Sequence, residues 1–551
     1  MGNFVINAFT SHLTDQLEDT VALHETMDAN LREFDSLNTK AESLFTKGNL
    51  NAAAVYALLA AWIAAHSHCG LFASARLERL LTAIGRQAQG DEGPPGRNAD
   101  RPDRFERVLH VASDVRNLGG LANMLRRWIE SDPSRTHSLA ITHQSGLVLE
   151  GLTEAVAKAG GKIIYVNREA GGIIGSARAL RRAALQNDVI VLHTANSDVI
   201  PSIAFAQPDL FPPVFFLNHS DHMFWLGSAV SHIVGSMRQA ALDIATQRRG
   251  IAPERSILVP ILATPPARST ERAKAKEKLG LAPDEILMIS VARAQKFRTL
   301  EGLTYADVHV PLLRDRPNAR LVVVGGGERP DWDDASAQVG GRIQSLEPQD
   351  PKPWFEAADI YVDSFPFCSA TSMMEAASYA IPCVSRFLWP DAARISGMDH
   401  PGLAGPLLEG RTNEAYLDHI RSLIDAPDKR KQSGDAILQS VKQSNATPGW
   451  NRYMEDAMDA AMRLPPVEPE QVYGNLLDDL PNMGEPDVRL QSLYGFSPPF
   501  TDLLRGHLTL LPLGERLRAW RRVYRAGGFG NAGAALKHLA PEWAVRRIKD
   551  R

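Results

Sequence analysis

Apolar residues recur in the first part of the chain at the three- and four-residue spacing of amphipathic helices. The clearest case is AESLFTKGNLNAAAVYALLAAWIAAHSHCGLF, in which Gly48-Asn49 separates two such runs. That spacing gathers the apolar side chains on one face of each helix. We therefore expect residues 1–88 to form an all-helical N-terminal domain.

From residue 105 onwards the pattern changes to short, wholly apolar runs that alternate with helical segments. The first series is RVLHVASD, THSLAITH, GKIIYVN, DVIVLHTA, PVFFLNH, HIVGSM and SILVPI, and the second is EILMISVA, ARLVVVGGG, GRIQSL, ADIYVDS and IPCVS. Runs that are apolar throughout are typical of parallel strands buried on both faces. Two such series predict an α/β chain with two doubly wound, Rossmann-like domains, at residues 105–266 and 267–464.

The remaining segments differ in composition. Residues 89–104 are rich in Gly, Pro and charge, and we expect a linker there. Residues 465–551 form a helical basic tail, whose part from 501 holds eleven Lys or Arg against four Asp or Glu. Within it, ERLRAWRRVYRA places Leu517, Trp520 and Val523–Tyr524 on one helical face. Such a face either rests on an anionic membrane surface or packs on the rest of the protein.

Composition excludes several classes of protein. The chain has 551 residues, 44% of them hydrophobic, with a formal net charge of −4, which gives no general attraction to nucleic acid. Its three cysteines form no CxxC pair, which indicates neither a disulfide framework nor a zinc site and suits a reducing compartment. We see no signal-peptide pattern and no apolar run long enough to span a membrane. We therefore expect a cytoplasmic protein.

Residues 357–385, AADIYVDSFPFCSATSMMEAASYAIPCVS, contain the most informative pattern. A strand is followed by small hydroxylated residues, Ser369, Thr371 and Ser372, and then by a helix that we expect to start near Met373. The N-terminus of such a helix, with hydroxyl donors beside it, favours a diphosphate. Glu375, which we place in the first turn, could accept hydrogen bonds from ribose hydroxyls. The alternative is ordinary N-capping of a helix that binds nothing.

The same segment resembles the donor site of the O-GlcNAc transferase family, glycosyltransferase family 41, which includes bacterial protein glycosyltransferases. The positions in step with that family are Asp359, Asp363, Pro366, Thr371, Ser372, Glu375, Ala376 and Pro382, followed later by Arg394 and Gly402. Ala370 and Ala380 depart from the pattern, since Ala380 stands where the family has Gly before Pro. The resemblance implies a GT-B fold with a nucleotide-sugar site in the C-terminal half.

Residues 286–302, ILMISVARAQKFRTLEG, end in a basic loop with Arg293, Lys296 and Arg298. Lys296 is in step with a Lys that neutralises the leaving diphosphate in family 41 and in family 4, and Arg293 lies beside it. A cation there takes the place of a metal ion, so we expect neither a metal nor a cofactor besides the donor substrate. The alternative is a solvated basic loop.

Two nearby motifs have a structural explanation. Gly325–Gly327 follow a strand without a G-x-G-x-x-G or Walker pattern. Asp331–Asp334 resemble the metal ligands of a DxD motif. We interpret both as a turn at the end of a strand, followed by a solvated acidic patch.

The first Rossmann-like domain contains candidate residues at the ends of two strands and in a glycine loop. Gly119 and Gly120, in SDVRNLGGLANMLRRW, resemble the glycine loop of family 4 enzymes, which contacts donor phosphate or acceptor. His193 ends the strand DVIVLHTANSD, and the family 4 resemblance implies a contact with the donor sugar. PVFFLNHSDHMFWLGS holds His219 and His222 beside Asp221. A His near a carboxylate can act as a general base toward an acceptor hydroxyl, and we choose His219.

The zinc interpretation of the H-x-x-H spacing lacks a third ligand of suitable spacing, and histidines satisfied by backbone groups remain an alternative. Family 4 enzymes that retain the anomeric configuration carry two Glu eight positions apart, and Phe367 occupies the first of these positions. Inversion, as in family 41, is therefore favoured.

We predict that the chain is a hexosyl- or N-acetylhexosaminyltransferase that uses a nucleotide sugar. The donor we expect is a UDP-sugar, with GDP- and dTDP-sugars as alternatives, and the acceptor is a hydroxyl on a protein or glycan. The tail could add a peripheral contact with the inner face of the membrane. Two other hypotheses stay open: a GT-B sugar-nucleotide epimerase, and a helical adaptor fused to a degenerate transferase domain.

Overall fold

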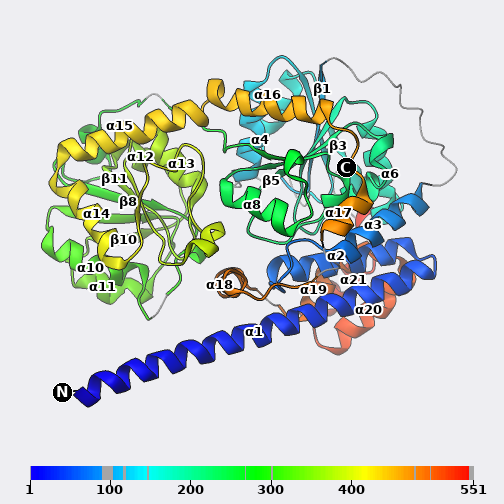
Figure 1. Ribbon diagram of the computed structural model, residues 1–551, viewed down its shortest axis with the longest axis horizontal. Helices are drawn as coiled ribbons and strands as arrows, with labels where there is room; N and C mark the ends of the chain where they lie inside the picture. The colour runs from blue at the N-terminus through cyan, green and yellow to red at the C-terminus, as the bar shows by residue number, and fades with distance from the viewer. Residues whose placement is uncertain are drawn as a thin grey trace. The chain divides into compact units, whose positions relative to one another are not determined.

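The computed structural model describes residues 2–89, 104–115, 120–144, 148–266, 268–299, 302–476, 480–496 and 498–544. It divides into two compact units (Figure 1). Unit 1 consists of Met1–Ser236, Ala241–Leu258 and Asp456–Arg551, and unit 2 of Met237–Ala240 and Val259–Glu455. The greater part of the expected linker, residues 90–103, lies outside the described residues.

Unit 1 contains a seven-stranded, wholly parallel sheet in the order β3-β2-β1-β4-β5-β6-β7. Its strands are β1 Arg107–Ala112, β2 Thr136–Ile141, β3 Ile163–Tyr165, β4 Val189–His193, β5 Val214–Asn218, β6 Ile233–Ser236 and β7 Ser256–Leu258. Helices α4 Gly120–Ser131, α5 Glu150–Lys158, α6 Gly172–Ala184, α7 Val199–Ala204 and α8 Gln239–Arg248 alternate with them. The strand order reverses between β1 and β4, which is where ligands bind in open α/β sheets.

Unit 2 is built on a six-stranded parallel sheet in the order β10-β9-β8-β11-β12-β13. Its strands are β8 Ile286–Val291, β9 Ala319–Val324, β10 Ile343–Leu346, β11 Ile360–Val362, β12 Cys383–Arg386 and β13 Leu408–Gly410. Its helices are α9 Arg272–Lys278, α10 Tyr305–Asp315, α11 Asp333–Ala337, α12 Lys352–Ala357, α13 Ala370–Ser378, α14 Asn413–Asp425 and α15 Pro427–Ser444, and α16 Thr447–Arg463 continues into unit 1. The two predicted Rossmann-like sheets are confirmed, with β13 as an additional edge strand.

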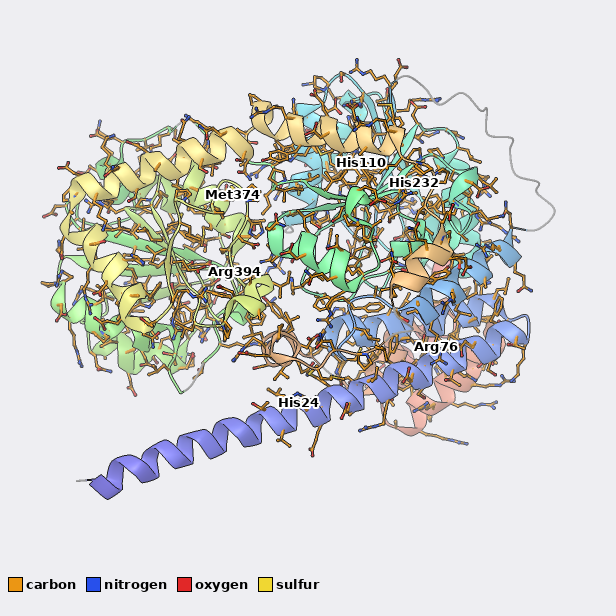
Figure 2. The ribbon with its side chains drawn as sticks, in the orientation of Figure 1. His24, Arg76, His110, His232, Met374 and Arg394 are labelled. Atoms are coloured by element: carbon orange, nitrogen blue, oxygen red, sulfur yellow. The ribbon has the colours of Figure 1, made fainter. Side chains whose placement is uncertain are left out.

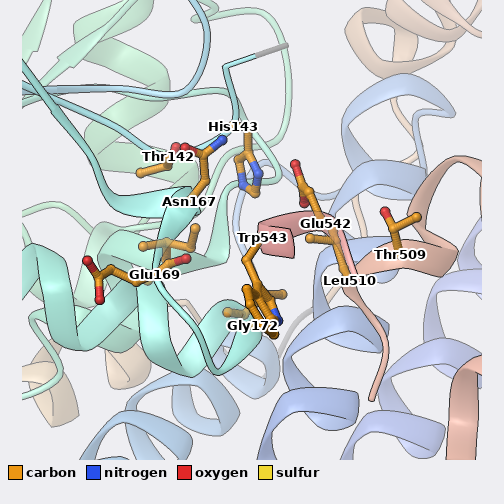
Figure 3. A pocket seen from close by; sticks show the side chains of 12 residues that line it. Thr142, His143, Asn167, Glu169, Gly172, Thr509, Leu510, Glu542 and Trp543 are labelled. Carbon is orange, nitrogen blue, oxygen red and sulfur yellow. The ribbon is translucent and has the colours of Figure 1, made fainter. Parts of the chain in front are cut away.

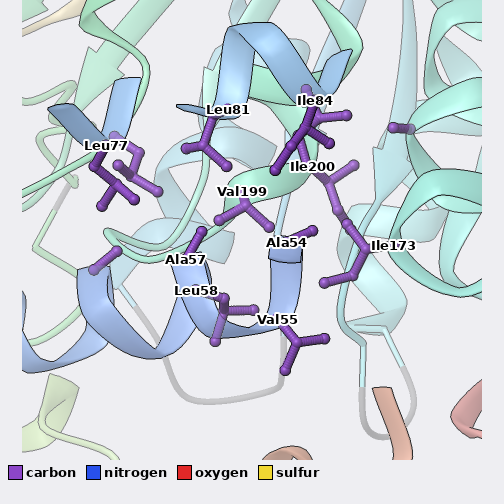
Figure 4. Close-up of a cluster of buried hydrophobic side chains, with 14 of the residues drawn as sticks. Ala54, Val55, Ala57, Leu58, Leu77, Leu81, Ile84, Ile173, Val199 and Ile200 are labelled. Carbon is purple, nitrogen blue, oxygen red and sulfur yellow. The ribbon is translucent and has the colours of Figure 1, made fainter. Parts of the chain in front are cut away.

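The N-terminal helices belong to unit 1. They are α1 Gly2–Thr46, α2 Leu50–His66 and α3 Ala75–Ala88. Figure 4 shows apolar side chains of α2 and α3, among them Leu58 and Ile84, packed with Val199 and Ile200 of α7. These helices therefore share one buried apolar cluster with the helices that cover the sheet, and they do not enclose a separate core.

The C-terminal tail also contributes to unit 1. It contains α17 Pro469–Asn475, α18 Glu485–Tyr494, α19 Phe500–His507, α20 Leu513–Arg525 and α21 Ala532–Lys537. Val523 of α20 is fully buried in the cluster that α2 and α7 share, and the indole of Trp520 donates to the carbonyl of Ala535 at 2.8 Å. Leu517 and Tyr524, in contrast, are 39% and 58% exposed. The apolar face predicted for this helix is thus divided between the core and the surface. Within the described residues, we find no helix with the length and apolarity needed to cross a membrane.

Candidate functional site

The helix that the sequence places at the donor site begins earlier than predicted. Strand β11 ends at Val362, and α13 starts at Ala370, with Ser369 as its N-cap. The prediction of a start near Met373 was wrong by three residues. Glu375 therefore lies in the second turn of the helix and not in the first, where the structure places no acidic residue.

The loop before α13 is organised by the carboxylate of Asp363. One of its oxygens accepts the backbone N–H groups of Ser364 at 2.9 Å and Ser369 at 3.0 Å. The hydroxyl of Ser364 donates to the carbonyl of Phe367 at 2.6 Å. Burial raises the pKa of Asp363 to about 7, although these N–H donors and Lys296 oppose the shift. The loop is thus held by a buried carboxyl group that accepts two of its backbone N–H groups.

Lys296 reaches this loop from the neighbouring strand. It ends the 3₁₀ turn Ala294–Lys296 after β8, and its Nζ donates to the carbonyl of Cys368 at 2.8 Å. Burial lowers the pKa of Lys296, while the nearby Asp363 opposes that change. Arg298 adds a second cation, with its guanidinium 4.8 Å from the ring centroid of Phe367. The structure therefore brings Lys296 directly to the start of α13, as the sequence predicted.

The hydroxylated residues at this helix start differ in accessibility. Ser369 is buried, and its hydroxyl oxygen lies within hydrogen-bond distance of that of Ser364, at 3.1 Å. Thr371 is exposed and Ser372 half-buried, as is Glu375. The Ser369 side chain makes no capping hydrogen bond to the first-turn N–H groups, which favours an anion as their partner. Arg293 is exposed on the same basic loop as Lys296.

The glycine turn and the acidic patch after β9 fit their structural interpretation. Gly325 and Gly327 have positive φ values of 93° and 68°, which the turn requires and glycine permits. Asp331 pairs with Arg329 at 2.6 Å, and this bond holds the pKa of Asp331 below its usual value. Among the residues that the structure describes, no group of three or more His, Cys, Asp or Glu is arranged to hold a metal ion.

In unit 1, His219 follows β5 at the carboxyl edge of the sheet, and the segment after it is held firmly. The buried Arg249 donates to the carbonyls of Asp221 at 2.7 Å and Met223 at 2.6 Å. Farther along, Glu78 of α3 accepts the N–H groups of Gly227 and Ser228. The N-terminal helices therefore support the segment that carries His219. Sequence reasoning did not find Arg249 or Glu78, because a buried Arg or Glu shows no periodicity of its own.

The candidate histidines differ in environment. His219 is half-buried, and burial lowers its pKa to about 4. The ring of His222 packs against that of Tyr494 in a tilted arrangement, with centroids 4.3 Å apart, and its Nδ1 lies 3.5 Å from Oδ1 of Asp221.

His193 is 1% exposed, and both of its ring nitrogens bond to other histidines, His110 at 3.0 Å and His219 at 2.9 Å. The predicted contact of His193 with a donor sugar is therefore wrong, because neither nitrogen is left for a ligand. His110 and His137 were missed by the sequence reasoning. Their signal was present as single polar residues inside the apolar strands RVLHVASD and THSLAITH.

Of the predicted glycine loop, Gly119 lies outside the described residues, and Gly120 begins α4. A small cavity of about 20 Å³ lies at the carboxyl edge of the same sheet. Figure 3 shows His143 and Asn167 on one side of it and Glu542 and Trp543 of the tail on the other. The tail thus packs beside the carboxyl edge of this sheet.

Comparisons with known proteins agree with this arrangement. Residues 286–426, which include Lys296 and all of α13, match the family model "Glycosyl transferases group 1". The chain carries a glycosyltransferase domain in a GT-B fold. Among curated proteins it is 28% identical to D-inositol 3-phosphate glycosyltransferase from Nocardia farcinica, over 30% of this chain and 39% of that one. The chain thus spans well under half the length of this relative.

Solved structures show the fold. A glycosyltransferase from Rickettsia africae superposes with a TM-score of 0.50 and 11% identity, over 65% of this chain and 99% of that one. A Thermobaculum terrenum O-GlcNAc transferase mutant aligns over 81% of this chain and 87% of that one, with 15% identity and a TM-score of 0.49. Together with the two parallel sheets, the Rickettsia structure confirms the predicted GT-B architecture.

Proposed function

We propose that this GT-B chain transfers a sugar from a nucleotide sugar, with a UDP-sugar as the first choice, to a hydroxyl acceptor. The observation that carries the proposal is the position of Lys296 at the uncapped start of α13, inside the segment that matches the glycosyltransferase family. A helix N-terminus and a fixed ammonium group together stabilise the negative charge that develops on a leaving diphosphate.

On the donor side, we assign the diphosphate to Lys296 and to the exposed start of α13 at Thr371 and Ser372. Glu375, one turn farther along and half-buried, is our candidate for the ribose hydroxyls. Arg293 adds charge to the same loop. Ser369 acts on the loop itself, since its hydroxyl is engaged with Ser364.

On the acceptor side, His219 is the proposed general base, in an inverting reaction on a protein or glycan hydroxyl. The matched relatives are named D-inositol 3-phosphate glycosyltransferases, so a phosphorylated polyol is a third acceptor class to test. The transferred group is a hexose or N-acetylhexosamine. We place the reaction in the cytoplasm of a bacterium, which the three cysteines without CxxC spacing support.

We also propose that transfer needs neither a metal ion nor a cofactor, because Lys296 and the helix dipole supply the positive charge. Turnover should be unchanged by excess EDTA. Loss of activity with EDTA that manganese restores would contradict this and direct attention to Asp331–Asp334.

The decisive experiment measures nucleotide release from a panel of UDP-, GDP- and dTDP-sugars with protein, glycan and inositol phosphate acceptors. Release that depends on acceptor, together with a glycosylated product, supports the proposal. Conversion of the donor to its epimer would identify an epimerase instead. Failure to bind any nucleotide sugar would favour the helical adaptor with a degenerate domain.

A further inference from the structure

Four histidines on neighbouring strands of unit 1 form one continuous line of hydrogen bonds. Nε2 of His219 lies 2.9 Å from Nδ1 of His193, and Nε2 of His193 lies 3.0 Å from Nδ1 of His110. Nε2 of His110 lies 2.9 Å from Nδ1 of His137, whose Nε2 is 3.1 Å from the carbonyl oxygen of Asp132. Every junction has the same sense, from Nε2 of one ring to Nδ1 of the next.

The line crosses one face of the sheet diagonally. His137 pairs with Val108 of β1, His110 lies two residues farther along that strand, and His193 pairs with Ala112, two residues farther again. His219 then follows β5. Residues two apart on a strand share a face, so the four rings descend from one end of the sheet to the carboxyl edge. Figure 2 labels His110 within this sheet.

The interior of the line is sealed from water. His110, His137 and His193 are at most 1% exposed. The buried Trp128 of α4 packs against two of these rings, with its ring centroid 4.9 Å from that of His110 and 5.6 Å from that of His193. Burial, with the neighbouring histidines, holds the pKa values of His110 and His193 well below the usual value. Both rings are therefore neutral, and each has one N–H that donates and one lone pair that accepts.

The Asp132 end fixes which nitrogen of every ring carries the proton. The carbonyl oxygen of Asp132, and its carboxylate at 3.4 Å, can only accept, so Nε2 of His137 must donate. Nδ1 of His137 then accepts a hydrogen bond from Nε2 of His110. In the same way, Nε2 of His193 donates to His110, and Nε2 of His219 donates to His193. At rest all four rings hold a proton on Nε2, and Nδ1 of His219 ends the line as a bare lone pair.

We propose that these four imidazoles form a proton relay, which carries the proton taken by His219 from the acceptor hydroxyl across the sheet to His137 beside Asp132. This rests on the proposed function of His219 as the base. His219 touches the substrate, whereas His193, His110 and His137 act through it.

The transfer balances at every ring. The acceptor O–H bond breaks as its oxygen bonds to the sugar and the nucleoside diphosphate leaves, and the proton moves to Nδ1 of His219. His219, His193 and His110 each pass their Nε2 proton to Nδ1 of the next ring. His137 ends as an imidazolium, and the other three rings hold their proton on Nδ1. After product release the reverse sequence returns one proton to solvent at His219.

The His137 end is suited to hold that charge. Asp132 follows the C-terminus of α4, where the helix dipole favours a cation. Although burial opposes it, hydrogen bonds from His137 and Arg135 hold the pKa of Asp132 well below its usual range, so the carboxylate stays ionised. Arg135 pairs with this carboxylate at 2.8 Å, so one anion lies between the guanidinium and the new imidazolium.

The first test does not require activity. In the full-length protein labelled with ¹⁵N-histidine, long-range ¹H–¹⁵N spectra report the tautomer of each ring. We expect the Nε2–H tautomer for His219, His193, His110 and His137 near neutral pH, with resonances assigned through single His→Gln variants. His309 supplies the opposite reference, because its Nδ1 must donate to the carbonyl of Tyr305. An Nδ1–H tautomer at His110 or His193 would overturn the relay.

The second test uses His110→Gln. The amide side chain keeps one hydrogen-bond donor and one acceptor, but it cannot take up a proton on one atom while it releases another proton from a second atom. We expect kcat to fall on the order of tenfold or more, while the KM for the nucleotide sugar stays constant. In the parent protein, kcat should depend on the D₂O fraction along a curve, because several protons move together. In the variant this dependence should become linear. His232→Gln is the control, since His232 is equally buried in unit 1 but accepts from the N–H of Val214, outside the line.

The outcomes separate the two proposals. Unchanged kcat and unchanged curvature in a well-folded His110→Gln protein would refute the relay while transfer itself stands. Absence of transfer in the parent chain would instead refute the proposed function, and the relay with it, whatever the tautomers.

Discussion

At the scale of single residues, Lys296 is the group on which the donor chemistry depends most. Its ammonium is held at the start of α13 by one hydrogen bond, to the carbonyl of Cys368. Lys296→Ala should lower turnover on the order of 10²-fold, because a preorganised charge next to the leaving group is lost. Steady-state kinetics with the best donor would measure this. Lys278→Ala, on the exposed end of α9, is the control. A Lys296→Ala turnover within twofold of the parent would contradict the assignment.

The raised pKa of Asp363 predicts that the free energy of unfolding depends on pH. Its pKa is raised to about 7 by burial, so the folded state keeps the proton after the unfolded chain has lost it. The stabilisation is present at acid pH and is lost as pH rises towards about 7. Asp363→Asn keeps an acceptor for both N–H groups but has no proton to lose. Between about pH 4 and 8, the parent should lose about 2–4 kcal/mol of unfolding free energy relative to this variant.

Chemical denaturation at a series of pH values measures this difference. Asp331→Asn is a contrasting control, because the bond from Arg329 lowers the pKa of Asp331. For that pair the parent should gain stability relative to the variant as pH rises. A pH-independent difference between the parent and Asp363→Asn would show that Asp363 does not titrate in this range.

The identities of the residues in the sequence indicated part of the candidate site but did not indicate the burial of His193. Lys296 and Thr371 could be singled out because each is in step with the donor site of family 41, whereas a cation after a strand and hydroxyls before a helix are common in proteins without such a site. The burial of His193 could not be predicted, because a strand end in the sequence does not show which face of the sheet a side chain occupies or which helix covers it. Here the cover is Trp128 of α4, which no local pattern connects to His193.

At the scale of elements, α13 shows why helix boundaries are hard to read. In the run Ser-Ala-Thr-Ser, Ser and Thr favour caps and turns over helix interiors, which favoured a loop up to Met373. In the structure the tight loop held by Asp363 positions Ser369 as N-cap. Packing therefore extends the helix back through Thr371 and Ser372, whose own helix preference is poor, to Ala370.

The other end of α13 makes a testable prediction. Ala380, just past the helix, has a φ of 55°, a left-handed conformation that costs a residue with a Cβ atom. Ala380→Gly should raise the free energy of unfolding by about 0.5–1 kcal/mol. Urea denaturation of the full chain would measure it. Ala377→Gly, inside the same helix, should instead destabilise by about 1 kcal/mol, and equal losses in both variants would contradict the left-handed assignment.

At the scale of the whole molecule, the two sheets could be predicted because parallel strands buried on both faces leave long apolar runs in the sequence. The association of the terminal segments could not. An amphipathic helix shows that it has a face to bury, but not what covers that face. Hence the sequence predicted residues 1–88 and the tail as separate parts of the chain. In the structure, both contribute side chains to one apolar cluster with the sheet of unit 1.

The apolar face of α20 in the tail either packs on the rest of the protein or rests on an anionic membrane surface. Two adjacent residues of this helix distinguish these interpretations. Val523 is fully buried, whereas Tyr524 is 58% exposed. If the helix is structural, Val523→Asp should destabilise unit 1 by about 3 kcal/mol or more, since an unpaired charge is buried. Tyr524→Asp should then alter the melting temperature little. If the helix also rests on anionic lipid, Tyr524→Asp should weaken binding to phosphatidylserine vesicles at low salt. Vesicle binding that is absent in the parent, together with a destabilised Val523→Asp protein, would assign this helix to the core alone.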